Sequence, residues 1–185
     1  MVKIGAFMNL FYAKVALYAY PNLLAVAKQI DDLVFKKAFA SMSDFSSAEK
    51  QCEKIIALTE QKDVIFELKL TLDEIFKKFS PEDLDLLDYK YFRKKPKKYF
   101  ENIDTSSRKY FRKQISICNR FSCLLEKKGY DDKRFQRELF KIEFFRELLK
   151  RVVEHEKLCR KNKTKKEKMK NATCALVVNE KVKTA

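Results

Sequence analysis

Residues 106–129 read SSRKYFRKQISICNRFSCLLEKKG, and this stretch decides the fold class. A helix over 106–128, at 100° per residue, separates its apolar and polar side chains almost completely. The apolar side holds Tyr110, Phe111, Ile115, Ile117, Cys118, Phe121, Leu124 and Leu125. The polar side holds Arg108, Lys109, Arg112, Lys113, Ser116, Asn119, Arg120 and Lys127. We expect an amphipathic helix with aromatics facing inward and cations outward, started by Ser106 and ended by Gly129.

Two further helical segments precede this helix. SPEDLDLLDYKYF, residues 80–92, begins with Ser80 as an N-cap and Pro81 at the first helical position, followed by acidic residues that suit a helix N-terminus. PKKYFENI, residues 96–103, predicts a short helix that opens at Pro96 and ends near residue 102. A polar break then leads to Ser106.

This order of segments resembles region 4 of sigma-70-type factors and related phage-type regulators. The resemblance covers residues 80–128 only, and it implies a helix-turn-helix whose recognition helix is capped by Ser106. Tyr99, Ile103 and Tyr110 match the spacing at which that family buries apolar residues. Gln114 stands where the family has Leu, and a shift of one residue would instead bury Phe111 and Ile115. The resemblance places these residues in or near the DNA-facing stretch: Ser107, Arg108, Lys109, Phe111, Arg112 and Lys113.

The N-terminal half predicts three helices. The first covers 7–20 and stops before Pro21, and the second covers 22–39 with Asn22 as its N-cap. Leu23, Val26, Ile30 and Leu33 form the apolar stripe of the second helix. The third covers 47–79 and carries a coiled-coil-like seam of Leu58, Ile65, Leu68, Leu72, Ile75 and Phe79. We expect this seam to pack on the 23–33 stripe, and pairing with another chain is the alternative.

The C-terminal part predicts a short helix or turn near 131–139, a helix over 140–158, and a basic tail. Only two glycines and three prolines occur in 185 residues, which favours long helices with few breaks. We therefore predict an all-α helical bundle with a helix-turn-helix-like module. The expected parts are a helical hairpin or bundle at 1–79, the basic module at 80–128, a helical segment at 129–158 and a basic, disordered tail at 159–185.

Charge is divided unevenly along the chain. Residues 1–88 carry 11 Lys and Arg against 14 Asp and Glu, whereas residues 89–185 carry 30 against 12. A strongly cationic half indicates an anionic partner such as DNA, RNA or a membrane surface. We expect duplex DNA. The candidate nucleic-acid-binding residues are Lys94, Lys95, Lys97, Lys98, Ser107, Arg108, Lys109, Arg112, Lys113, Ser116, Asn119 and Arg120.

Other functions are alternatives to DNA recognition. An RNA- or ribosome-associated protein could stack Tyr and Phe on unpaired bases, although most of these aromatics should be buried. A helical adaptor could contact RNA polymerase or form a homodimer through the 58–79 seam. The N-terminal apolar run is interrupted by Asn9 and Lys14, so we read it as a core helix and expect no membrane contact.

Enzyme chemistry has little support in the sequence. His155 is the single histidine, no two of the five cysteines have C-x-x-C spacing, and no glycine-rich phosphate loop occurs. We therefore predict no catalytic residues, no metal and no cofactor. The cysteines are odd in number and widely spaced, which is typical of free thiols in the cytoplasm.

Overall fold

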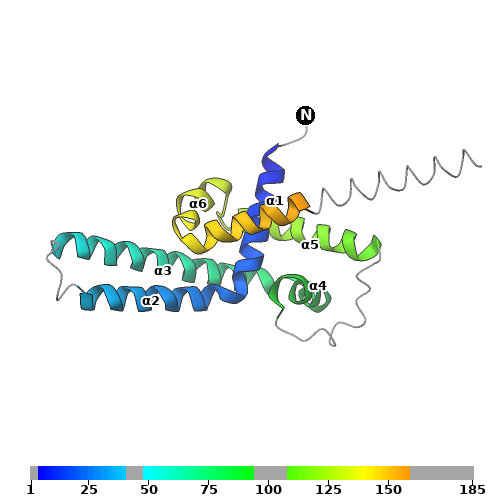
Figure 1. Cartoon of the computed structure of the whole chain (residues 1–185). Coiled ribbons are helices and arrows are strands. Elements are labelled where there is room, and N and C mark those ends of the chain that lie inside the picture. The colour runs from blue at the N-terminus through cyan, green and yellow to red at the C-terminus, as the bar shows by residue number, and fades with distance from the viewer. Residues whose placement is uncertain (1–3, 41–47, 94–107, 159–185) are drawn as a thin grey trace, which may run out of the picture. The chain divides into compact units, whose positions relative to one another are not determined.

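The computed structural model describes residues 4–40, 48–93 and 108–158, and the chain divides into two compact units, Met1–Leu149 and Lys150–Ala185. Every regular element in the described ranges is helical, and they contain no strand (Figure 1). The prediction of an all-α helical bundle is confirmed. The Ser106 cap, the short helix at 96–102 and the tail at 159–185 lie outside the described residues.

Two helices at the N-terminus meet at a bend. Helix α1 (Ile4–Ala19) passes through a 3₁₀ turn, η1 (Tyr20–Asn22), into α2 (Leu23–Ala40). The predicted start of the second helix is confirmed, because α2 begins at Leu23, directly after Asn22, which is the last residue of the 3₁₀ turn. Pro21 lacks an N–H, so the chain gives up little hydrogen bonding by turning there. Figure 1 shows the resulting change of direction between α1 and α2.

The same stretch has the composition of a membrane span. Residues Leu10–Phe39 form a helical run long and apolar enough to cross a membrane by length and composition, although half of its most apolar window is buried within the structure. Buried core helices pass the same test.

Helix α3 (Ala48–Phe76) lies alongside α2 and forms a hairpin with it (Figure 1). The second half of the predicted seam is buried: Ile65, Leu68, Leu72 and Ile75 are fully enclosed, and Phe79 nearly so. It packs against α2 in the same chain, as expected, where Leu23, Val26 and Ile30 are buried. Leu33 departs from the prediction, since 46% of it is exposed beyond the end of the enclosed stripe.

The next segment begins at Ser80, whose hydroxyl accepts a hydrogen bond from the Asp83 N–H at 3.3 Å, as the sequence predicts. Helix α4 (Pro81–Leu87) continues into one π-helical turn, η2 (Asp88–Phe92). Arg93 then adopts a left-handed backbone with φ of 51° and donates to the Asp88 carbonyl. The π turn places both Tyr91 and Phe92 in the core.

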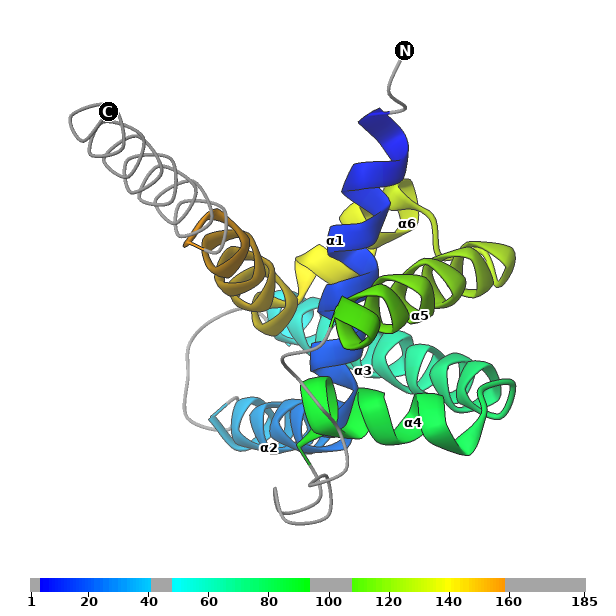
Figure 2. The same cartoon turned by 90° about the vertical axis from the view of Figure 1, so that its right-hand side faces the viewer.

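Helix α5 (Arg108–Lys127) crosses α1, as Figure 2 shows, and also contacts α3. Phe121 stacks on Phe76 of α3, with ring centroids 5.7 Å apart. The helix ends as predicted at Gly129, whose φ of 83° is a left-handed conformation suited to glycine.

The chain then forms α6 (Asp132–Arg137), a 3₁₀ turn η4 (Leu139–Lys141) and a last helix whose described part covers 143–158. Asp131 caps α6 by accepting a hydrogen bond from the Arg134 N–H at 2.8 Å. Phe135 stacks on Tyr12 of α1 at 5.2 Å, which ties this region to the core.

Candidate nucleic-acid interface

The inward side of α5 differs in part from the sequence prediction. Tyr110, Ile117, Cys118, Phe121 and Leu125 are buried as expected. Phe111 and Ile115 are not: 53% of Phe111 and 61% of Ile115 is exposed, so their predicted burial is wrong.

Gln114 faces the core, whereas the register shifted by one residue would have buried Ile115 there instead. It is half-buried, and its amide donates to the Tyr91 hydroxyl at 3.5 Å. The Tyr91 hydroxyl also lies 3.1 Å from the Cys118 sulfur. Burial raises the pKa of Tyr91, so the phenol stays neutral and able to donate. A polar partner in the core thus lets Gln114 face inward and turns Phe111 outward.

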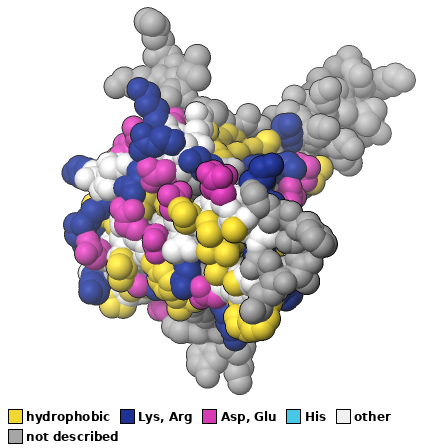
Figure 3. All heavy atoms as spheres, turned by 90° about the vertical axis from the view of Figure 1, so that its left-hand side faces the viewer, with side chains coloured by type: hydrophobic (Ala, Val, Ile, Leu, Met, Phe, Trp, Pro, Cys, Tyr) yellow, Lys and Arg dark blue, Asp and Glu magenta, His cyan; other side chains and the backbone are white. Residues whose placement is uncertain are grey.

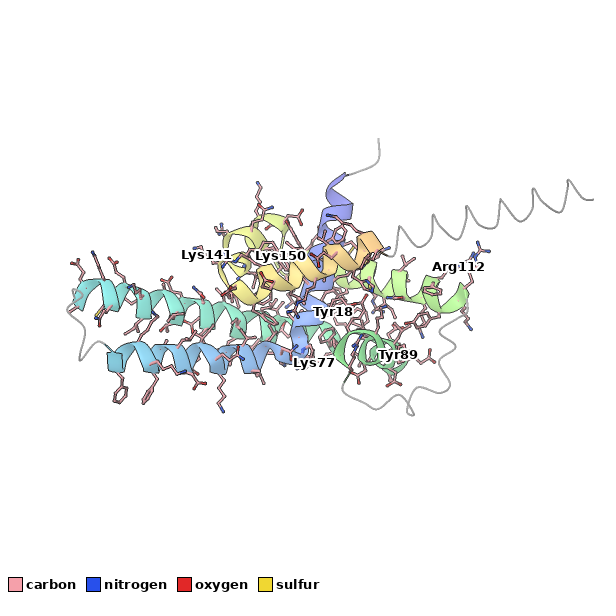
Figure 4. All side chains as sticks on the ribbon, viewed as in Figure 1. Tyr18, Lys77, Tyr89, Arg112, Lys141 and Lys150 are labelled. Carbon is pink, nitrogen blue, oxygen red and sulfur yellow. The ribbon has the colours of Figure 1, made fainter. Side chains whose placement is uncertain are left out.

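The outward side of α5 begins with three exposed cations: Arg108, Lys109 and Arg112. None of the three forms an ion pair with another residue in the described ranges. Figure 4 shows Arg112 pointing away from the helices of the bundle. Ser116 and Asn119 continue this exposed side toward the middle of the helix.

Two other predicted contact residues, Lys113 and Arg120, face α4 instead. The Lys113 ammonium lies 2.9 Å from a Glu82 carboxylate oxygen and 3.5 Å from one of Asp83. The hydrogen bond with Glu82 raises the pKa of Lys113, which keeps it charged at neutral pH. Sequence reasoning missed this role of the acidic turn, because it assigned both carboxylates only to the helix N-terminus.

Arg120 reaches the end of α3. Its guanidinium donates to the Lys78 carbonyl at 2.7 Å and lies 4.9 Å from the centre of the Phe79 ring. A carboxylate oxygen of Asp83 lies 3.9 Å from the same guanidinium. Arg120 of α5 thus contacts both α4 and the residues that follow α3. Arg120 therefore joins helices as well as facing solvent.

Several other cations of the bundle have carboxylate partners. Arg134 donates to Glu67 and Glu138, each at 2.6 Å, and Lys62 donates to Asp31 at 2.6 Å. Lys128 pairs with Glu74. By contrast, Arg108, Lys109 and Arg112 at the start of α5 form no ion pair with another described residue.

The remaining candidates, Lys94, Lys95, Lys97, Lys98 and Ser107, lie outside the described residues. Of the described residues, no group of three or more His, Cys, Asp or Glu side chains is arranged to hold a metal ion.

Comparisons with known proteins give no relative to transfer a function from. No protein-family model, no curated protein and no solved structure matches this chain. The likeness to sigma region 4 stays a prediction from the sequence.

Proposed function

We propose that this protein binds duplex DNA through the outward side of α5 and acts as a small sigma-like or phage-type transcription regulator. One observation carries the proposal: Arg108, Lys109 and Arg112 share an exposed helix start with no carboxylate partner in the described part of the chain. Like charges held together without counter-ions attract a polyanion, and binding is driven by the counterions it releases.

The spacing of these residues suits a helix in the major groove. Arg108, Arg112 and Asn119 are four and seven residues apart, so they share one side of α5. The major groove is about 12 Å wide and admits a helix, where Arg can read guanine and Asn can read adenine. Lys109 lies at the edge of this side and would contact phosphate.

The salt dependence of binding tests the proposal. We expect Arg108→Ala with Arg112→Ala, which removes two base contacts, to lower affinity for duplex DNA at least about tenfold. Lys109→Ala, which removes a phosphate contact, should flatten the slope of log affinity against log salt by about one. Fluorescence anisotropy with a labelled duplex at several salt concentrations measures both.

A matched control separates a local contact from a change in net charge. Lys133→Ala with Lys141→Ala also removes two exposed positive charges, from α6 and η4. This control should bind DNA nearly as well as the wild type. Equal losses in the two double variants, or wild-type binding that ignores salt, would rule the proposal out.

Binding to RNA is the second candidate, and the exposed Phe111 ring favours it. An aromatic ring beside cations can stack on an unpaired base. Competition of the labelled duplex by unlabelled single-stranded RNA and by unlabelled duplex decides between the two.

A further inference from the structure

Helix α3 carries a second stripe of residues on the side opposite its buried seam. Cys52, Ile56, Thr59, Asp63, Phe66 and Leu70 recur at steps of four and three, which is coiled-coil spacing. All six are exposed, and Leu70 exposes 66% of its surface. The 58–79 seam, which the sequence offered as an alternative surface for pairing with another chain, packs within this chain instead, because Leu72 is fully buried.

Helix α2 adds to the same side of the hairpin. Lys62 of α3 pairs with Asp31 of α2 at 2.6 Å, which marks the edge where the two helices meet on this side. Leu24, Phe35 and Phe39 follow Asp31 around α2 on that side, and the rings of Phe35 and Phe39 lie 4.5 Å apart. We call this surface the hairpin face; its apolar members are Leu24, Phe35, Phe39, Ile56, Phe66 and Leu70.

Exposed apolar side chains are concentrated on this hairpin. Of the ten large hydrophobic residues exposed in the described ranges, seven belong to α2 and α3. Single exposed hydrophobic residues need no explanation, but a gathering of this kind marks an interaction surface. Figure 3, which faces the hairpin end, shows hydrophobic side chains set between carboxylates and cations.

The two helices of the hairpin face differ in charge. Glu53, Glu60 and Asp63 lie on or beside the stripe of α3, and Lys28, Asp32 and Lys36 follow one another at steps of four along α2. All six are exposed, and none forms an ion pair with another residue that the structure describes. The α3 edge is thus acidic, and the α2 edge carries two lysines and one aspartate.

We propose that a second copy of this chain docks on the hairpin face and that the two hairpins form a four-helix bundle. A surface with complementary edges is self-complementary, because one two-fold axis satisfies both edges at once. The α2 edge of one copy, with two lysines against one aspartate, then meets the acidic α3 edge of the other.

The charges also choose the arrangement. Placing α3 against α3 would bring Glu53, Glu60 and Asp63 against their own copies, which is repulsive. If the two-fold axis runs parallel to the helices, α2 of one copy packs against α3 of the other. Residues at the same level along the hairpin then face each other. Because Asp31 is level with Lys62, this brings Asp63 near Lys28 of the second copy.

Sedimentation of the full chain at about 1–100 µM tests the dimer, a range that covers Kd values of about 1–100 µM. We expect a dimer for the wild type and a monomer for Phe35→Asp with Leu70→Asp. Both residues are exposed, so helicity by circular dichroism should not change. Ile115→Asp on α5 is the matched control, because Ile115 is 61% exposed and should leave the dimer intact.

A charge exchange tests the arrangement. Lys28→Glu alone and Asp63→Lys alone should each weaken the dimer about two- to thirtyfold, since each change acts twice. Both changes in one chain should restore it. A wild type that stays monomeric, a dimer that survives Phe35→Asp with Leu70→Asp, or a charge-exchanged chain weaker than either single variant overturns the proposal. No nucleic acid is present in these measurements, so their outcome is independent of DNA binding.

Discussion

The Lys113 ammonium on α5 lies 2.9 Å from the Glu82 carboxylate in the first turn of α4. The contact divides the cations of α5 into two kinds. Lys113 and Arg120 reach toward α4 and the end of α3, whereas Arg108, Lys109 and Arg112 project from the helix start. Lys113 and Glu82 are 31 residues apart in the sequence. Their contact fixes which side of α5 faces α4 and therefore which side stays open.

The two kinds of cation should respond to substitution in opposite ways. Lys113→Met removes a contact with Glu82 that is mostly exposed, so it should lower the free energy of unfolding by no more than about 1 kcal/mol. It should leave affinity for duplex DNA within about twofold, a change below the cost of a lost phosphate or base contact. Arg112→Met should leave stability unchanged and weaken DNA binding.

Urea unfolding and DNA titration of the same two variants measure this contrast. Each variant is the control for the other, since both lose one positive charge from adjacent positions of α5. A Lys113→Met protein that keeps its stability but binds DNA as poorly as Arg112→Met would contradict the division.

Phe121 and Phe111 are ten residues apart on α5 and lie in opposite environments. Phe121 is fully buried and stacks on Phe76, so Phe121→Ala should cost about 3–5 kcal/mol of stability through lost burial and a cavity. Phe111→Ala should change stability by no more than about 0.5 kcal/mol, because its ring is largely exposed. Urea unfolding of both variants compares them, and equal costs would mean that α5 is rotated from the orientation described above.

The sequence predicts those features of this region that follow from helical periodicity and capping. They are the helix α5, its end at Gly129 and the buried seam of α3. Periodicity does not show which residues of α5 lie at the centre of its buried side, because that depends on the neighbouring helices. The Tyr91 hydroxyl accepts from Gln114, so a polar residue faces inward and Phe111 faces out. Leu33 shows the same limit, because the enclosed part of the α2 stripe ends at Ile30.

Tyr20 and Asp73 give stability a dependence on pH. The Tyr20 hydroxyl donates to the Asp73 carboxylate at 2.7 Å, and Lys69 donates to the same group at 2.5 Å. Burial alone would raise the pKa of Asp73, but these hydrogen bonds outweigh it and lower the pKa. A carboxyl with a lowered folded pKa stabilises the fold above its unfolded pKa of about 3.9, and this contribution is lost as the pH falls through the folded value.

Tyr20→Phe should therefore cost about 1 kcal/mol at pH 7, and this cost should shrink as the pH falls below about 4. Urea unfolding of variant and wild type at several pH values gives the difference. Tyr12→Phe is the matched control, because the Tyr12 hydroxyl accepts from the neutral amide of Gln136 at 3.2 Å. Its cost should not depend on the ionisation of a carboxylate. A cost of Tyr20→Phe that stays constant down to pH 3 would contradict the role of Asp73.

Phe111 distinguishes a duplex from a single-stranded partner, which Arg108 and Arg112 alone cannot do, because both kinds of nucleic acid carry phosphate. A base stacked on an aromatic ring contributes about 1–3 kcal/mol, and a leucine in place of the ring loses this stacking. In a duplex groove the same ring would make only an apolar contact, which leucine preserves. We expect Phe111→Leu to keep duplex affinity within about twofold, well short of the stacking loss. Anisotropy titrations with a duplex and with a single-stranded RNA of equal length measure both affinities. The opposite outcome is a wild type that binds the RNA more tightly than the duplex and a Phe111→Leu variant whose RNA affinity falls about fivefold or more. That outcome would assign the outward side of α5 to base stacking instead.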